Sequence, residues 1–379
     1  MGFFLAVFFF LYSLLHFYLF TRAKTALGLG PAVAVPLIIF LIIMIIAPLA
    51  MHLAEGGGFE LLARVIAYAG YTWMALVFLL FCTLLVTDIY RLSVHLAGAI
   101  AGSAFPRLIL SARSCFLLSL ASAAAIAFYG WNEAGAVRVE TIAIASSKIP
   151  ARVSPLRIVQ ISDVHLGLTL GVERLQKIMR FVREAHPDLL VSTGDLVDGR
   201  VDDEKAAVKA LRAAAPRYGK FAITGNHEFY AGLGPALAFT NEAGFRVLRG
   251  EAVTVGDAIN IVGVDDPAGP GYGSSATGEK AVLSSVANGK FTLLLKHRPV
   301  VDAQSAPLFD LQLSGHLHDG QIFPFRLITR LFFPFIAGLY PFPPHAALYV
   351  NRGSGSWGPP IRVLAPPEVT VIELFRPHS

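Results

Sequence analysis

The first third of the chain consists mainly of long apolar runs separated by short polar stretches. A helix needs about 20 apolar residues to cross a bilayer. Runs close to this length occupy residues 2–20, 32–51, 65–86 and 114–131. One run alone is also typical of a buried core helix or a signal peptide, but four in succession predict a transmembrane domain of about four helices over residues 1–131. We expect a shorter apolar stretch, 92–105, to be a re-entrant or interfacial piece.

The pattern changes after residue 131. Residues 132–154 predict a linker, and from residue 155 onward short apolar, β-branched runs alternate with stretches of helical spacing. We expect strands at 156–162, 188–193, 221–224, 259–264, 291–296, 311–314, 348–353 and 369–374, and helices at 171–186 and 202–214. This alternation predicts an α/β sandwich with mixed sheets over residues 155–379.

Composition excludes some classes of protein. Hydrophobic residues make up 55% of the chain and charged residues 15%, which is too apolar for a soluble protein of this length. From Lys148 onward basic and acidic residues are nearly balanced, so no nucleic-acid partner is expected. The two cysteines, Cys82 and Cys115, lie in apolar stretches, which excludes a stabilising disulfide framework.

The short loops predict the orientation, because Lys and Arg concentrate on the cytoplasmic side of a membrane. The loops after the first and third runs are basic, with Arg22, Lys24, Arg91, Arg107 and Arg113. The loop after the second run carries two glutamates and one arginine. Both termini are therefore expected outside, so the α/β domain would be periplasmic or extracellular.

Polar residues follow the carboxyl ends of the predicted strands, where ligand sites of open α/β sheets gather. Each motif alone is typical of a capped turn or a surface residue, but their common placement favours one site. Mixed carboxylate, imidazole and amide donors suit Mn, Fe, Co or Zn better than Ca or Mg. The motifs SDVHLG, GDLVDG, GNHE and SGHLHDG, with one histidine after FTLLLK, supply Asp163, His165, Asp195, Asp198, Asn226, His227, His297, His316 and His318.

The ordered motifs DxH, GDxxD, GNHE, H and GHxH resemble those of the calcineurin-like metallophosphoesterase superfamily, specifically its membrane-anchored bacterial branch of phosphohydrolases. The resemblance covers roughly Pro155 to the C-terminus and includes LYVNRGSGSWGPPIRVLAPPEVTVIEL. It implies a four-layer αββα sandwich with two mixed sheets, held at the bacterial inner (plasma) membrane. It also implies two divalent metal ions, with Mn favoured over Fe, Zn or Co.

The resemblance further implies a role for each site residue. The ligands of the first metal would be Asp163, His165 and His318, those of the second Asn226, His297 and His316, and the bridging ligand Asp195. A metal-activated water would attack phosphorus in line.

Two further residues would complete the chemistry that the resemblance implies. His227 would stabilise the developing charge and protonate the leaving oxygen, and Asp198 would orient a ligand or loop. The chain departs from many relatives at one motif, because it has GHLHDGQ where they have GHTHGGQ. Leu317 and Asp319 therefore change the local shape and charge of the pocket but leave the metal ligands in place.

The segment 322–344, directly after GHLHDGQ, is dense in Phe and Leu, with Arg326 and Arg330 interspersed. No single helical period runs through it, and Pro324 and Pro334 interrupt it. Either it packs on the core of its own domain or it forms a surface that dips into the bilayer, where the arginines meet lipid phosphates. Its position beside two predicted metal ligands favours a phosphorylated lipid as substrate.

The leading hypothesis is a membrane-anchored hydrolase that cleaves a phosphate ester or pyrophosphate of a lipid-linked substrate. One alternative is a UDP-2,3-diacylglucosamine-type pyrophosphatase of lipid A synthesis, whose substrate is cytosolic, so the orientation of the domain discriminates the two. Another alternative is a membrane sensor or scaffold with a non-catalytic phosphoesterase domain. The complete ligand set and the presence of His227 argue against that second alternative.

Overall fold

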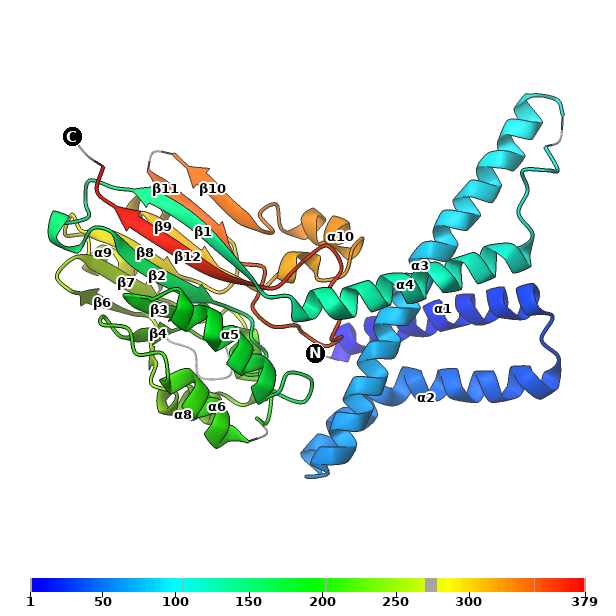
Figure 1. Ribbon diagram of the computed structural model, residues 1–379, viewed down its shortest axis with the longest axis horizontal. Coiled ribbons are helices and arrows are strands. Elements are labelled where there is room, and N and C mark those ends of the chain that lie inside the picture. Colours follow the sequence, from blue (N-terminus) through cyan, green and yellow to red (C-terminus); the bar gives the residue numbers. More distant parts are fainter. Residues whose placement is uncertain (1, 104, 202, 270–277, 344, 378–379) are drawn as a thin grey trace. The chain divides into compact units, whose positions relative to one another are not determined.

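The computed structural model describes residues 2–103, 105–201, 203–269, 278–343 and 345–377. The chain divides into two compact units (Figure 1). One unit comprises residues 1–132 together with Gly358–Ile361, and the other comprises Glu133–Trp357 together with the residues from Arg362 onward. The change of pattern after residue 131 in the sequence therefore falls close to the boundary between the two units.

Apolar helices build the first unit: α1 (Gly2–Leu27), α2 (Pro31–Gly56), α3 (Glu60–Ile100) and α4 (Ala112–Gly135). All four are long and apolar enough to span a membrane, which confirms the four predicted runs. Residues 92–100 of the stretch expected to be re-entrant or interfacial form the last part of α3, which ends at Ile100.

Polar side chains connect α1 to α3 inside the first unit. The buried ring of His16 contacts the backbone carbonyl one turn earlier through Nδ1 at 2.7 Å, and its Nε2 accepts a hydrogen bond from Trp73 Nε1 at 2.9 Å. Further along the same helices, Tyr18 donates to Asp88 at 2.8 Å, and Arg22 pairs with the same carboxylate. Polar groups in hydrocarbon need such internal partners, so these contacts hold the two helices together.

The second unit contains two six-stranded sheets, with strand orders β1-β12-β2-β3-β4-β5 and β10-β11-β9-β8-β7-β6. Both are mixed, because β12 runs antiparallel to β2 in the first sheet, and β6 and β10 are the antiparallel edges of the second. The strands are β1 (Arg138–Ala145), β2 (Leu156–Ile161), β3 (Leu189–Ser192), β4 (Lys220–Ala222), β5 (Arg246–Val247), β6 (Glu251–Val255), β7 (Ile259–Gly263), β8 (Phe291–Leu295), β9 (Leu311–Ser314), β10 (Gly338–Phe342), β11 (Ala346–Val350) and β12 (Glu368–Phe375).

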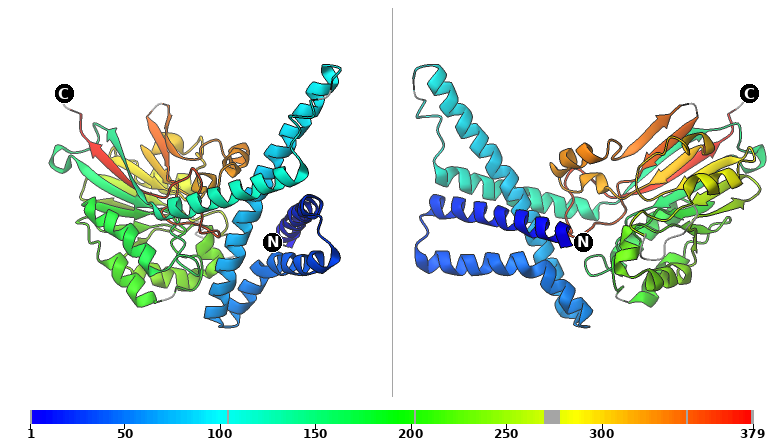
Figure 2. Two further views of the ribbon diagram at one scale, coloured as in Figure 1. Left: turned by 45° about the vertical axis from the view of Figure 1, so that its right-hand side comes forward. Right: turned by 180° about the vertical axis from the view of Figure 1, so that it is seen from behind.

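Three apolar layers fill the sandwich. Alternate residues of β2 face opposite sides: Ile158 packs between the two sheets, whereas Val159 packs under the helices α5 (Val172–Glu184), α6 (Glu204–Arg212) and α8 (Leu233–Glu242). Figures 1 and 2 show these helices over one face of the first sheet. Helix α9 (Glu279–Ser285) covers the outer face of the second sheet around Val262 and Leu294. The predicted four-layer αββα arrangement is thus confirmed.

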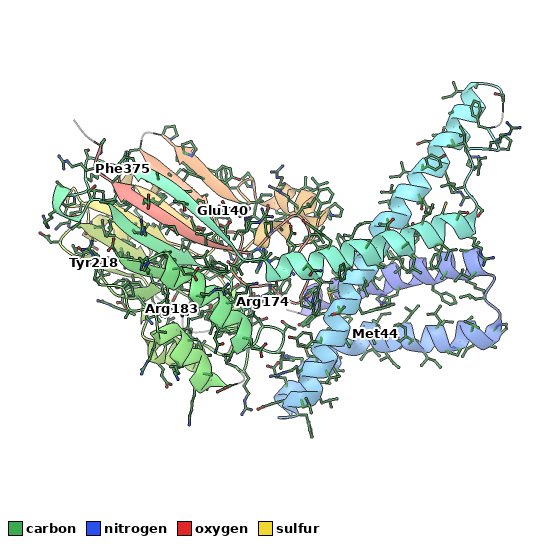
Figure 3. The ribbon with its side chains drawn as sticks, viewed as in Figure 1. Met44, Glu140, Arg174, Arg183, Tyr218 and Phe375 are labelled. Carbon is green, nitrogen blue, oxygen red and sulfur yellow. The ribbon has the colours of Figure 1, made fainter. Side chains whose placement is uncertain are left out.

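The stretch expected to be a linker contains strand β1. This strand pairs in parallel with β12 along its whole length, from Arg138 opposite Glu368 to Ala145 opposite Phe375. The half-buried Arg352 side chain forms ion pairs with the carboxylates of Glu368 and of Glu140 on β1, and Glu140 is labelled in Figure 3. The strand was missed because it lies at a sheet edge and its partner comes more than two hundred residues later.

The apolar segment 322–344 forms two elements, helix α10 (Phe325–Phe332) and strand β10. The two prolines that suggested an interrupted segment lie on either side of α10, at its N-cap and just beyond its end. The last residue of the segment, Pro344, lies outside the described residues.

Candidate functional site

The predicted site residues lie in loops that follow the carboxyl ends of five strands from both sheets. The loop after β2 carries Asp163 and His165, and the loop after β3 carries Asp195. Helix α7 (Asn226–Ala231) begins directly after the β4 loop, so Asn226 is its first residue. Asp198 also follows β3 and His227 is the second residue of α7, while His297 follows β8 and His316 and His318 follow β9. Two sheets that pack face to face therefore direct both sets of loops to one edge.

Potential ligand atoms gather at this edge in three overlapping groups, within each of which all atoms lie within 4.8 Å of one another. The groups are Asp163 with His165 and His318; Asp195 with His297 and His316; and His165 with Asp195 and His227. Asp195 belongs to two of them. The first two groups contain the residues that the sequence analysis expected around a first and a second metal, apart from Asn226.

The distances within these groups are short. The Nε2 atom of His318 lies 3.0 Å from His165 Nε2 and 3.5 Å from Asp163 Oδ1. The Nε2 atom of His297 lies 3.1 Å from Asp195 Oδ2. Acceptor atoms that face one another this closely in a buried place require a proton or a cation between them.

Asn226 provides an independent observation that favours a cation-binding site. Its side chain is buried, yet its Oδ1 atom has no hydrogen-bond partner among the described residues. An unsatisfied buried polar group costs about 1–3 kcal/mol. A divalent cation bound by the neighbouring carboxylate and imidazoles would satisfy this oxygen, and the mixed donor set suits a transition metal.

In the absence of metal, the positive charge at this edge is carried by histidine. Burial alone would lower the pKa of His297, but the carboxylates of Asp195 and Asp163 outweigh burial and raise this pKa to about 10. Burial and the charge of His297 lower the pKa of His316 to about 3. Burial would raise the pKa of Asp195, but His297 holds it well below its usual range. A cation that binds here would therefore replace the proton of His297.

Two glycines allow the loops to approach one another. A Cβ atom on Gly225 would lie 2.1 Å from Asp195 Oδ1, and a Cβ atom on Gly315 would lie 2.1 Å from Asp163 Oδ2. Any other residue would push the loop away from the carboxylate. The glycines of the GNHE and SGHLHDG motifs are therefore needed because the backbone at Gly225 and Gly315 packs directly against the predicted ligands Asp195 and Asp163.

His227 is a half-buried member of the cluster, and it contacts two carboxylates. Its backbone N–H donates to Asp195 Oδ1 at 2.9 Å, and its Nδ1 pairs with Asp198 Oδ1. Burial disfavours its charge, but Asp195 and Asp198 outweigh burial and raise the pKa of His227 to about 9. The rings of Tyr230 and Trp357 pack against it with centroids 5.5 and 5.7 Å away. At neutral pH this imidazole is a proton donor.

Glu228 is a site residue that sequence reasoning missed. Its buried carboxylate accepts hydrogen bonds from the backbone N–H groups of Asp195, Leu196 and Val197 at 3.0, 2.7 and 3.3 Å. It also accepts from the N–H of Gly225 at 2.7 Å. The Glu228 side chain thereby connects the loop that carries Asp195 to the loop that carries Gly225 and Asn226. The sequence did contain an indication of this role, because Glu228 is the last residue of the GNHE motif and directly follows Asn226 and His227.

Arg362 is the second missed residue. Its side chain is fully buried, and its Nη2 atom lies 2.8 Å from His318 Nδ1. The same guanidinium donates to the backbone carbonyls of Arg352, Gly355 and Ala365 at 2.6–2.9 Å. Burial and the charge of Arg362 lower the pKa of His318, so this ring stays neutral. The only sequence signal was an arginine within the apolar stretch PIRVLAPP.

Comparison with known proteins identifies the family. Residues 156–320 match the calcineurin-like phosphoesterase family. An uncharacterized metallophosphoesterase of Aquifex aeolicus is 39% identical over 248 residues, which cover 65% of this chain and 95% of that protein. An uncharacterized metallophosphoesterase of Bacillus subtilis is 35% identical over 61% of this chain and 83% of its own length.

A membrane-associated relative also matches. The zebrafish transmembrane protein with metallophosphoesterase domain is 35% identical over 274 residues, which cover 68% of this chain. The match spans 62% of the zebrafish protein, less than two thirds of its length. Together with the motifs and the two-sheet fold, these matches show that the chain belongs to the calcineurin-like metallophosphoesterases.

Proposed function

We propose that the chain is a metal-dependent hydrolase of phosphoric esters or pyrophosphates that holds two divalent cations. The observation that carries the proposal is the buried cluster of facing carboxylate and imidazole atoms, with the unsatisfied Asn226 oxygen at its side. The proposed ligands are Asp163, His165 and His318 for one cation, Asn226, His297 and His316 for the other, and Asp195 for both. Mn is favoured, with Fe, Zn and Co as the other candidates.

When bound, such cations lower the pKa of water and neutralise charge on phosphoryl oxygens. The residues of the chain would do the remaining work. Glu228 connects the loop of Asp195 to the loop of Asn226, so these two residues would hold the same cation. Arg362 keeps His318 neutral and oriented.

His227 would act as the general acid. Its Nδ1 atom is engaged by Asp198, which leaves Nε2 as the nitrogen that can give a proton to the leaving oxygen. The carboxylates of Asp195 and Asp198 keep the ring protonated at neutral pH. Asp198 therefore has a positioning role, because it fixes the tautomer and direction of His227 and lies 3.8 Å from His165 Nδ1.

The first test concerns the proposed shared ligand. Asp195→Ala should abolish hydrolysis and reduce bound metal while the protein remains folded, because the carboxylate contacts both halves of the cluster. Asp257→Ala removes an exposed carboxylate outside the cluster and is the matched control. This variant should retain both hydrolysis and bound metal. Elemental analysis of purified wild-type protein, reconstituted with Mn, should find two transition metals per chain. Fewer than one would contradict the dimetal proposal.

The second prediction concerns His227. His227→Ala should leave the metal content intact and lower turnover by about 10²–10⁴-fold for alkyl phosphates, whose leaving oxygen needs a proton. The loss should be much smaller for 4-nitrophenyl phosphate, whose leaving group departs without protonation. An equal loss on both substrates would show that His227 is not the acid.

The substrate is proposed to be lipid-linked. Two features support this: four helices able to span a bilayer on the same chain, and exposed apolar residues in the segment that follows His316 and His318. Purified protein with Mn should therefore release phosphate or a phosphorylated product from phospholipids, polyprenyl phosphates or nucleotide-lipid pyrophosphates. Hydrolysis confined to small soluble esters in this screen would refute a lipid-linked substrate.

The location of the α/β unit follows from the charges of the loops. The basic residues after the first and third helices favour the cytoplasmic side, so we propose that the catalytic unit lies in the periplasm or outside the cell. A reporter fused after Ser379 should then be active only when exported. A reporter active only in the cytosol would overturn this topology and favour the UDP-2,3-diacylglucosamine-type reaction.

A further inference from the structure

Helix α10 has an unusual distribution of side chains for a helix on an α/β domain. At 100° per residue, its apolar residues fall on one half of the helix and Arg326, Thr329 and Arg330 on the other. On the apolar half, Leu327, Ile328, Leu331 and Phe332 are exposed, and α10 contains no buried residue. The exposed fractions on that half are 47% for Phe325, 55% for Leu327, 46% for Ile328, 81% for Leu331 and 75% for Phe332.

The polar half of α10 is the side attached to the catalytic loop. Arg326 forms an ion pair with the buried carboxylate of Asp319, with Nε and Oδ1 3.0 Å apart, and Asp319 directly follows His318. The backbones are also close, because a Cβ atom on Gly320 would lie 2.5 Å from Arg326 Cα. The helix is thus fixed by its charged side and presents its apolar side outward.

The exposed surface extends beyond the helix. Trp357, 51% exposed, is held next to the start of this segment by two hydrogen bonds between its backbone and the side chain of Gln321, at 2.9 and 3.0 Å. The same indole packs against His227. An apolar surface that begins beside the proposed acid and continues over α10 is typical of an interaction site.

A lipid bilayer fits this surface better than a soluble partner. The chain carries four helices able to span a membrane, and α4 ends at Gly135, only two residues before β1 begins at Arg138. Only Ala136 and Val137 lie between these two elements, so the α/β unit is tethered by a short connection to a helix able to span a membrane. A short helix with an apolar half and arginines on the other half is the pattern of an interfacial helix that meets anionic headgroups.

We propose that α10 is an interfacial membrane helix whose apolar half, formed by Phe325, Leu327, Ile328, Leu331 and Phe332, lies at the boundary between headgroups and acyl chains. Arg330 then faces lipid phosphates, while the pair of Asp319 and Arg326 ties the helix to the loop that carries His316 and His318. This membrane contact stands independently of the proposed reaction, because it rests on exposure and charge alone.

The test uses the full chain in nanodiscs that contain anionic phospholipids. The chain has two cysteines, so replacement of Cys82 and Cys115 by serine gives a background for single labels. A fluorophore is attached at Leu331→Cys or, as a second apolar position, at Phe332→Cys. Lys205→Cys on α6, an exposed position on an ordinary amphipathic helix, is the matched control.

Labels at 331 and 332 should be quenched strongly by nitroxide-bearing lipids and shielded from iodide in the water. The label at 205 should be quenched by iodide and only weakly by the nitroxide-bearing lipids. Quenching by iodide as strong as at 205 would show that the apolar half of α10 faces water and would overturn the proposal. Protection from both quenchers would also overturn it, because another part of this chain or a second copy would then cover the helix. None of these outcomes depends on turnover. The membrane contact of α10 and the proposed hydrolase activity can therefore fail independently, and the experiments distinguish the two failures.

Discussion

The constraint on which the α/β unit depends is the concentration of negative and lone-pair atoms at one buried sheet edge. Asp163 and Asp195 are buried next to four histidines, and such a group is stable only with compensating positive charge. Without metal, the proton on His297 supplies part of it. The glycines at 225 and 315 allow the backbone to approach these carboxylates, and the four N–H groups bound by Glu228 hold the loop of Asp195 against the loop of Asn226.

The residues of the candidate metal site and the order of their supporting strands were predictable from sequence, because each candidate ligand lies directly after a buried apolar strand. The four apolar helices were predictable for a similar reason, since length and hydropathy alone define them. Strand β1 escaped because half of it faces solvent and its pairing partner is distant in sequence. Glu228 and Arg362 escaped because their roles depend on which backbone groups lie nearby, and no periodic pattern encodes that.

The helix α10 illustrates a different limit. Prolines on either side of it suggested an irregular segment, whereas they mark where the helix begins and where the chain turns toward β10. Phe333 and Phe335, which look equivalent to Phe332 in sequence, pack against His316 and against Tyr340 and Phe342. Four of the seven aromatic residues in this segment therefore contact other aromatic rings of the α/β unit, and only the tertiary structure separates them from the exposed ones.

The strand order has a consequence for biosynthesis. Because β12 lies between β1 and β2, the strand that emerges directly after the last membrane helix has no partner until residues 368–375 have been made. During elongation both β1 and β2 present open edges, which are prone to pairing with other chains. The first sheet therefore cannot close before residues 368–375 have been made, and a nascent chain stalled before this point would expose two unpaired strand edges that are prone to aggregation.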